Sequence, residues 1–202
     1  MKILIFSDVH ANMDALNILY EEFSVCDLSI CLGDIVGYYC QVNEVSEFLQ
    51  KKKTICLLGN HDNYVLNGIT RNVNERVLQG IAYARAHLTE KNLNWLATLD
   101  SSCQMSIDGR LFFCCHGSPW DPLEEYLYAD NPHLANLVSL PYDAIFWGHT
   151  HRPYCREEHG KLFANPGSVG QPRHAKNKVC ALLFDSKNFT LHFIEKEIVC
   201  FP

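Results

Sequence analysis

The stretch Lys2-Ile3-Leu4-Ile5-Phe6-Ser7-Asp8-Val9-His10 decides the fold, because it joins an apolar strand directly to side chains that bind metals. Four more apolar runs end in the same way: Ile30-Cys31-Leu32 before Gly33-Asp34, Ile55-Cys56-Leu57-Leu58 before Gly59-Asn60-His61-Asp62, Leu111-Phe112-Phe113-Cys114-Cys115 before His116-Gly117, and Ile145-Phe146-Trp147 before Gly148-His149-Thr150-His151. In an open α/β sheet, ligands bind at the carboxyl ends of the strands. The pattern therefore predicts one metal site that several strands supply together.

The bulk composition is that of a globular protein. The 202 residues fit a single domain, which we place at 1–202, and 48% of them are hydrophobic. No apolar run approaches the roughly 20 residues that a membrane span needs, so we expect no membrane partner. The net charge of −6 argues against a dedicated nucleic-acid surface, which needs a basic face.

The amino terminus and the cysteines indicate a cytoplasmic location. The chain enters a strand at once and reaches Asp8, so a cleaved leader would remove a candidate ligand and we expect none. None of the ten cysteines forms a C-x-x-C pair, and most lie inside apolar runs. We therefore expect reduced core thiols rather than disulfides or a cysteine zinc site.

Apolar residues at helical spacing alternate with the strands in the first half of the chain. We predict helices over 12–23, capped by Asn12, and over 44–53, capped by Asn43. The segment 62–100 reads as a helical insertion that walls one side of the site. The second half carries the pairing pattern of hairpins, at 103–107 with 111–115 and at 179–185 with 190–195. The predicted fold class is α/β, with two packed mixed β-sheets flanked by helices.

The candidate ligands are two carboxylates, one amide and four imidazoles: Asp8, His10, Asp34, Asn60, His116, His149 and His151. Each motif alone is as compatible with an ordinary turn, and only the joint pattern favours a site. Two metals need roughly seven to eight protein ligands, one of them a bridging carboxylate. Mixed oxygen and nitrogen ligands suit manganese, iron, cobalt, nickel or zinc better than calcium. His61, beside Asn60, is the candidate general acid, with Asp62 to orient it.

In the order of these motifs, from Asp8-x-His10 to Asn165-Pro166-Gly167-Ser168, the chain resembles the calcineurin-like metallophosphoesterase superfamily, in particular its small bacterial and archaeal phosphodiesterase branch. The resemblance implies an α-β-β-α sandwich with two divalent ions, manganese first. It implies that one ion is held by Asp8, His10, Asp34 and His151, and the other by Asp34, Asn60, His116 and His149. It further implies that Asp34 bridges the ions, that a metal-bridging hydroxide attacks phosphorus, and that His61 protonates the leaving group.

A phosphodiesterase acting on a small phosphate ester is the expected function. No arginine-rich clamp for a dianionic monoester stands out, and we interpret Arg173 as a solvated loop charge. Trp120 follows His116 and is a candidate for the pocket wall. The alternatives are a phosphomonoesterase or protein phosphatase, a nuclease, and a non-catalytic scaffold such as the retromer subunit that this fold resembles. Nothing in the sequence specifies an oligomeric state.

Overall fold

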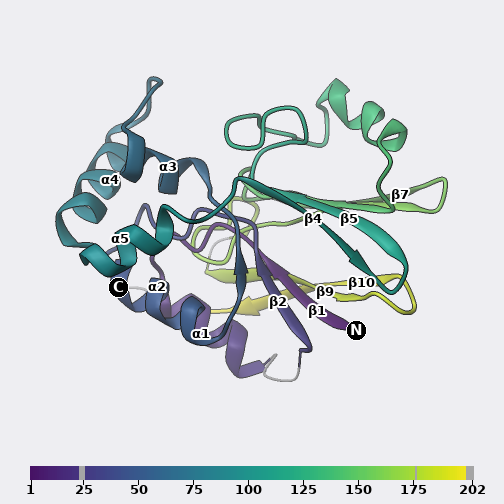
Figure 1. Cartoon of the computed structure of the whole chain (residues 1–202), viewed down its shortest axis with the longest axis horizontal. Helices are drawn as coiled ribbons and strands as arrows, with labels where there is room; N and C mark the ends of the chain where they lie inside the picture. The colour runs from purple at the N-terminus through teal and green to yellow at the C-terminus, as the bar shows by residue number, and fades with distance from the viewer. Residues whose placement is uncertain (23–25, 176, 199–202) are drawn as a thin grey trace.

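Two five-stranded sheets lie face to face in the computed structural model, which describes residues 1–22, 26–175 and 177–198 (Figure 1). The first sheet has the order β10 (Thr190–Glu197), β9 (Lys178–Asp185), β1 (Lys2–Phe6), β2 (Leu28–Cys31), β3 (Ile55–Cys56). The second has the order β4 (Ser102–Ile107), β5 (Arg110–Cys115), β6 (Ala144–Phe146), β8 (Lys161–Pro166), β7 (Pro153–Glu158). Strands β1, β2 and β3 are parallel, as are β5, β6 and β8, and the outer pairings are antiparallel. Both sheets are mixed, which confirms the predicted fold class.

Alternate side chains of the central strands enter different cores. In β1, Ile3 and Ile5 pack between the two sheets, whereas Leu4 and Phe6 face the helices. In β6, Phe146 packs between the sheets, while Ile145 faces the opposite layer. Successive residues of a strand point to opposite faces, so a continuous apolar run fits a strand that is covered on both sides. This is why the strand runs are apolar throughout instead of alternating with polar residues.

The helices form the outer layers. They are α1 (Met13–Glu22), α2 (Val42–Lys51), α3 (Asn60–Asn67), α4 (Glu75–His87), α5 (Glu90–Leu96) and a 3₁₀ helix (Pro132–Ser139). Figure 1 shows α1 and α2 beside the first sheet and the 3₁₀ helix on the far side of the second. Helices α3, α4 and α5 occupy the segment that we expected to be helical, 62–100, although α3 begins two residues earlier.

The two predicted helix caps have different outcomes. Asn12 caps α1 as predicted, because its Oδ1 accepts the N–H of Ala15 at 3.0 Å; residue 23, the predicted end, lies outside the described residues. The cap at Asn43 is wrong, because α2 begins at Val42. The Asn43 amide instead accepts the N–H of Thr89 at 2.9 Å and donates to the carbonyl of His87 at 2.8 Å. The side chain that we predicted as a helix cap therefore forms a tertiary contact between α2 and the α4–α5 junction instead.

Both predicted hairpins are present. Strands β4 and β5 pair around Asp108-Gly109, whose φ angles of 50° and 78° suit a two-residue turn. Strands β9 and β10 pair across the 186–189 turn. The nine described cysteines are free, but only five of them are buried core thiols as predicted, while Cys40 and Cys155 are exposed. Cys200 lies outside the described residues. Among the helices of the described ranges, none is long and apolar enough to cross a membrane.

Candidate metal centre

The carboxyl ends of five strands, three from the first sheet and two from the second, meet at one end of the sandwich. Asp8 follows β1, Asp34 follows β2, and Asn60 begins α3 just after β3. His116 directly follows β5, while His149 and His151 lie in the loop after β6. All seven predicted ligands are buried. The loops are tied to one another, since the N–H of Asp8 donates to the carbonyl of Gly33 at 3.0 Å and that of His10 to the carbonyl of Asp34 at 2.9 Å.

The two carboxylates each have one oxygen fixed by the backbone. Oδ1 of Asp34 accepts the N–H of His61 at 2.8 Å, and Oδ2 of Asp8 accepts the N–H of His149 at 3.1 Å. The other oxygens face the histidines. Oδ2 of Asp34 lies 3.4 Å from Nε2 of His116 and 3.7 Å from Nε2 of His10, so it stands between the two halves of the cluster.

Three histidines are oriented by backbone carbonyls. The Nδ1 atoms of His10, His116 and His151 lie 3.3, 3.0 and 2.6 Å from carbonyl oxygens, which can only accept, so Nδ1 is the donor in each pair. A neutral ring then presents the lone pair of Nε2 to the cluster, the arrangement that metal-binding histidines share. Nε2 of His10 and Nε2 of His151 approach to 3.1 Å. Two lone pairs at this separation repel each other unless they share a cation.

The donor set fits two divalent cations. Asp8, His10, Asp34 and His151 present ligand atoms that lie within 4.8 Å of one another, as do Asp34, His116 and His149. Oδ1 of Asn60 lies 3.1 Å from Nε2 of His116, which brings the amide to the second group. Oδ1 of Asp8 and Nε2 of His149 are buried without a hydrogen-bond partner. Such atoms destabilise a fold unless they are satisfied, and coordination satisfies them.

Five of the seven candidate ligands have left-handed backbone conformations: Asp8, His10, Asp34, His149 and His151, with φ between 51° and 64°. Residues with a Cβ seldom adopt such angles, and each costs of order 1–3 kcal/mol. Strain of this kind persists only where the surrounding structure imposes it. Here the left-handed backbone directs these side chains toward the same cluster immediately after each strand.

Two glycines allow the loops to approach closely. A Cβ on Gly59 would lie 2.1 Å from the nitrogen of Asp34 and 2.2 Å from its Oδ1. A Cβ on Gly148 would lie 2.0 Å from Oγ of Ser7. Neither distance is compatible with a side chain, so glycine at these positions lets Asp34 and Asp8 sit against the neighbouring strand ends.

The electrostatics of the cluster attract positive charge. Burial alone would raise the pKa values of the two carboxyls, but His151 beside Asp8 and His116 beside Asp34 hold them below the ordinary range. Burial disfavours the charged form of His116, yet the nearby Asp34 carboxylate outweighs it and raises the pKa of His116 to about 9. Burial and the charge of His116 lower the pKa of His149 to about 3.

His61 lies at the cluster, but Asp62 does not orient it. Nε2 of His61 is 3.9 Å from Oδ2 of Asp34, and Nδ1 has no hydrogen-bond partner. The Asp62 carboxylate instead accepts three backbone N–H groups, from Gly59, Ile35 and Val36, at 2.9, 3.1 and 3.0 Å. The expectation that Asp62 holds the imidazole is therefore wrong. Asp62 lies in the first turn of α3 and accepts the N–H of Gly59, the N-cap of that helix, while Ile35 and Val36 belong to the loop after β2.

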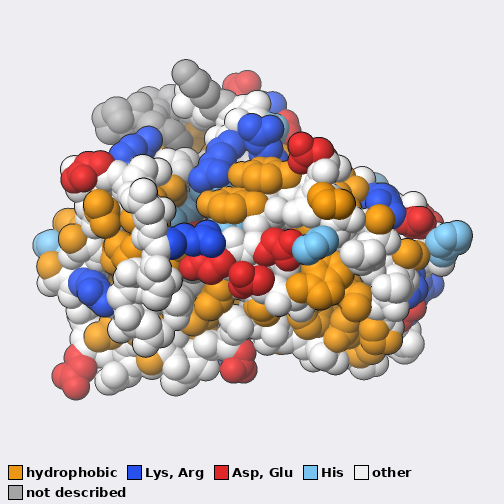
Figure 2. Space-filling model, turned by 90° about the horizontal axis from the view of Figure 1, so that it is seen from above, with side chains coloured by type: hydrophobic (Ala, Val, Ile, Leu, Met, Phe, Trp, Pro, Cys, Tyr) orange, Lys and Arg blue, Asp and Glu red, His pale blue; other side chains and the backbone are white. Residues whose placement is uncertain are grey.

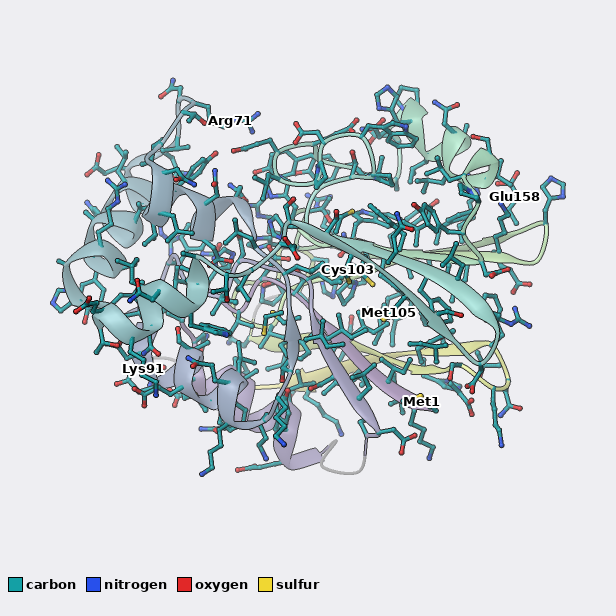
Figure 3. The ribbon with its side chains drawn as sticks, viewed as in Figure 1. Met1, Arg71, Lys91, Cys103, Met105 and Glu158 are labelled. Atoms are coloured by element: carbon teal, nitrogen blue, oxygen red, sulfur yellow. The ribbon has the colours of Figure 1, made fainter. Side chains whose placement is uncertain are left out.

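A cavity of about 220 Å³ opens over the cluster. Asn60 and His61 line it together with side chains from α3, α4 and the loop between them, including Arg71 and Val77. Arg71 pairs with Glu124 of the 117–131 loop at 2.8 Å, and Figure 3 shows Arg71 at the tip of the α3–α4 loop. The helical segment thus walls one side of the cavity, as we expected.

Three residues that line this cavity lie outside both the predicted site residues and the predicted 62–100 segment: Tyr38, Tyr126 and Arg173. Arg173 is exposed, as we expected for a loop charge, but it also lines the cavity together with Tyr38. Its only sequence signal was its position shortly after Gly167-Ser168. Trp120 is 42% exposed, packs its edge on His133 and lines neither this cavity nor its neighbour, so it is not a wall residue.

Comparison with known proteins agrees with this geometry. Residues 1–188 match the calcineurin-like phosphoesterase superfamily domain. An uncharacterized protein of Methanocaldococcus jannaschii is 31% identical over 96% of this chain and 87% of its own. The crystal structure of a metallophosphoesterase from Sphaerobacter thermophilus is 28% identical with a TM-score of 0.84, over 98% of this chain and 89% of its own. A hypothetical protein from Pyrococcus horikoshii shares the fold, with a TM-score of 0.87 at 18% identity over 98% of this chain and 88% of its own. The chain therefore belongs to the calcineurin-like phosphoesterase superfamily and is a metal-dependent phosphoesterase.

Proposed function

We propose that the protein hydrolyses small phosphodiesters at a dinuclear metal centre. One ion is held by Asp8, His10, Asp34 and His151, and the other by Asp34, Asn60, His116 and His149. The observation that carries this proposal is the position of Asp34, which belongs to both groups of candidate ligands. Its Oδ2 lies near Nε2 of both His10 and His116, while its Oδ1 is fixed by a backbone N–H. A carboxylate held in this way is suited to bridge two cations.

The chain's own groups have distinct tasks in this reaction. The bound cations supply Lewis acidity, which lowers the pKa of water and polarises the phosphoryl group. Backbone N–H groups hold the Asp8 and Asp34 carboxylates at the cluster, where these side chains would hold the cations. His61 lines the cavity, and its unpartnered Nδ1 and its Nε2 near Asp34 leave the ring free to give a proton to the departing oxygen.

The charge balance of the cavity supports a diester over a monoester. Of the two arginines that line it, Arg71 is neutralised by Glu124, which leaves Arg173 as the cation beside the cluster. A diester carries a single negative charge and needs fewer cations than a dianionic monoester. Arg173 nevertheless favours phosphomonoesters as the second candidate, because its guanidinium suits a free phosphoryl oxygen. The volume of about 220 Å³ supports a small-molecule substrate.

Manganese is the proposed ion, with iron, zinc, nickel and cobalt as alternatives that suit the same ligands. The free thiols of the described residues support the proposed cytosolic location. The test is hydrolysis of bis-p-nitrophenyl and mono-p-nitrophenyl phosphate by protein whose metal content has been measured. We expect two ions per chain and a higher kcat/KM for the diester. Absence of turnover of both esters by the loaded protein refutes the proposal, and absence of bound metal favours the scaffold alternative.

Matched variants separate the site from general effects. Asp34→Asn retains the acceptor for the His61 N–H but removes the bridging charge, so at least one ion and nearly all turnover are lost. Asp14→Asn, at an exposed position in α1, is the control. His61→Gln keeps both ions but loses the general acid, and its slower rate shows most with poor leaving groups. His192→Gln, on an exposed strand position, is its control. Equal rates for Asp34→Asn and the parent protein contradict the proposed bridge.

A further inference from the structure

His149 is held differently from the other three candidate histidine ligands. Backbone carbonyls orient His10, His116 and His151 through Nδ1. Within the described residues no carbonyl does this for His149, and its buried Nε2 has no hydrogen-bond partner. Instead, the ring of Tyr126 lies on the imidazole, with ring centroids 3.7 Å apart and planes at 20°. The orientation of the His149 ring therefore depends on a side chain from another loop.

The contact between the two rings fixes the property that a metal ligand needs. Planar rings at this separation touch across their faces, so the imidazole of His149 cannot turn about its Cβ–Cγ bond without colliding with Tyr126. That rotation sets the direction in which Nε2 points. The backbone of His149 is fixed separately, because its N–H donates to Asp8 at 3.1 Å. The backbone thus places the residue, whereas Tyr126 fixes the plane of its ring.

Tyr126 is itself held in place by its neighbours. Its ring also packs on Tyr128, with centroids 5.4 Å apart and planes at 2°. The next residue, Leu127, is buried, and its carbonyl accepts the indole N–H of Trp147 at 3.1 Å. Trp147 precedes His149 by two residues in the chain. The segment that carries the candidate ligand is therefore bonded to the segment that carries its stacking partner.

Glu124 fixes the same 117–131 loop on its other side. Its Oε2 accepts the hydroxyl of Tyr64 at 3.0 Å and pairs with Arg71 at 2.8 Å. Tyr64 is buried and lies in α3, the helix that begins at Asn60. Figure 2 shows acidic and basic side chains together at the centre of the face seen from above, the side on which these loops lie in Figure 1. The loop is thus attached at both ends of the segment that presents Tyr126.

We infer that Tyr126 is a positioning residue for the ion assigned to His116 and His149, here called the second ion. The inference rests on the proposed function for that assignment. Partners that orient metal ligands contribute about 10- to 100-fold to metal affinity. The first ion does not depend on Tyr126, because backbone carbonyls orient His10 and His151. Loss of the Tyr126 ring should therefore weaken one ion selectively.

The test is a manganese titration of the metal-free full chain by calorimetry, with EPR spectroscopy to distinguish a lone bound ion from a pair. We expect Tyr126→Ala to weaken the second ion about 10- to 100-fold and to leave the first unchanged. Tyr126→Phe should keep the affinities of the parent protein, because stacking needs the ring and not the hydroxyl. Tyr126→Leu keeps an apolar side chain without a planar face and should behave as the alanine variant does, so it serves if that variant fails to fold.

The matched control is Trp120→Ala, which removes an exposed aromatic ring from the same loop and should change neither affinity. Unchanged affinity for the second ion in a folded Tyr126→Ala or Tyr126→Leu protein overturns the inference. An equal loss in Tyr126→Phe also overturns it, because the hydroxyl and not the ring would then be responsible.

Two backgrounds show whether Tyr126 acts through His149. In a His149→Ala protein, which retains the first ion, adding Tyr126→Ala should not weaken the remaining ion further. In a His10→Ala protein, which retains the second ion, adding Tyr126→Ala should weaken the remaining ion about 10- to 100-fold. Equal losses in the two backgrounds would show a general effect on the fold and refute the positioning role.

Failure of this inference and failure of the proposed function give different results. A protein that hydrolyses the chromogenic diester, but whose second ion is unaffected by Tyr126→Ala, has the proposed activity without this positioning residue. A protein that hydrolyses neither ester, but loses the second ion selectively in Tyr126→Ala, has the positioning residue without the proposed activity.

Discussion

Substitution of Gly148 by alanine tests the close approach on which the metal centre depends. The new Cβ would lie 2.0 Å from Oγ of Ser7, 2.9 Å from its Cβ and 3.0 Å from Oδ2 of Asp8. Non-bonded heavy atoms rest at about 3.5–4.0 Å, so the loop after β6 has to retreat by more than ~1 Å. That retreat pulls on the contact between the His149 N–H and Asp8, which is 3.1 Å, and on the bond from the Gly148 N–H to His116, which is 2.9 Å.

Both stability and activity are affected. Overpacking of this kind costs about 1–3 kcal/mol in the free energy of unfolding. A displacement of ~1 Å in a catalytic constellation costs about 100-fold in rate. We therefore expect Gly148→Ala to fold, to melt at a lower temperature, and to hydrolyse bis-p-nitrophenyl phosphate about 100-fold more slowly with weaker metal binding.

A second substitution should partly reverse the effect. Oγ of Ser7 is the nearest atom and is itself buried without a partner, so Ser7→Ala removes the worst contact and no hydrogen bond. The double variant is expected to recover about tenfold in rate, because the contacts at 2.9 and 3.0 Å remain. Gly160→Ala is the control: its φ is +74° but nothing lies within 4 Å of the added Cβ, so it loses about 1 kcal/mol of stability and no activity.

The assay is steady-state hydrolysis at saturating metal, with metal content and melting temperature measured on the same samples. Full activity and two bound ions in Gly148→Ala would show that the strand ends do not approach one another as the structure has them. Lack of any recovery in the double variant would show that Ser7 is not the obstructing group.

Three further predictions concern the cluster and its supports. In the metal-free protein, the Asp34 carboxylate raises the pKa of His116 from 6.5 to about 9, so the stability from this group is complete below pH 6.5 and is lost as the pH rises through 9. The melting temperature in chelator should therefore fall between pH 6.5 and 9, and added manganese should restore it at pH 9. A melting temperature that does not change with pH contradicts the reasoning. Asp62→Ala leaves three buried backbone N–H groups without an acceptor and should lower the free energy of unfolding by about 3 kcal/mol or more, whereas Asp62→Asn should lower it less. An unchanged midpoint of urea unfolding in Asp62→Ala rules this role out. Arg173→Ala should lower kcat/KM for the diester about tenfold, and Arg173→Lys should recover part of that loss. Equal values of kcat/KM in the two variants and the parent protein would show that Arg173 does not contact the substrate.

Local signals in the sequence predicted much of the fold. Apolar runs in β1 and β6 were identifiable because each strand is covered on both faces, and the Asn12 cap was identifiable because its partner, Ala15, is three residues away. The Asn43 cap failed for the opposite reason, since its partners lie more than 40 residues along the chain. The predicted role of Asp62 in orienting His61 was wrong for the same reason, because its carboxylate accepts backbone N–H groups of the distant 33–37 loop instead.

The sequence by itself determined which side chains stand at the strand ends, because the carboxyl ends of parallel strands lie at the same end of a sheet. Only the tertiary structure decided that the carboxyl ends of strands from both sheets meet at Asp34, that left-handed backbone turns the candidate ligands inward, and that Tyr38, Tyr126 and Arg173 line the cavity beside them. Those residues lie in loops without periodicity, where position is set by contacts between distant segments and not by local propensity. The candidate ligands can therefore be identified from short motifs, whereas the cavity beside them forms only when the loops pack together.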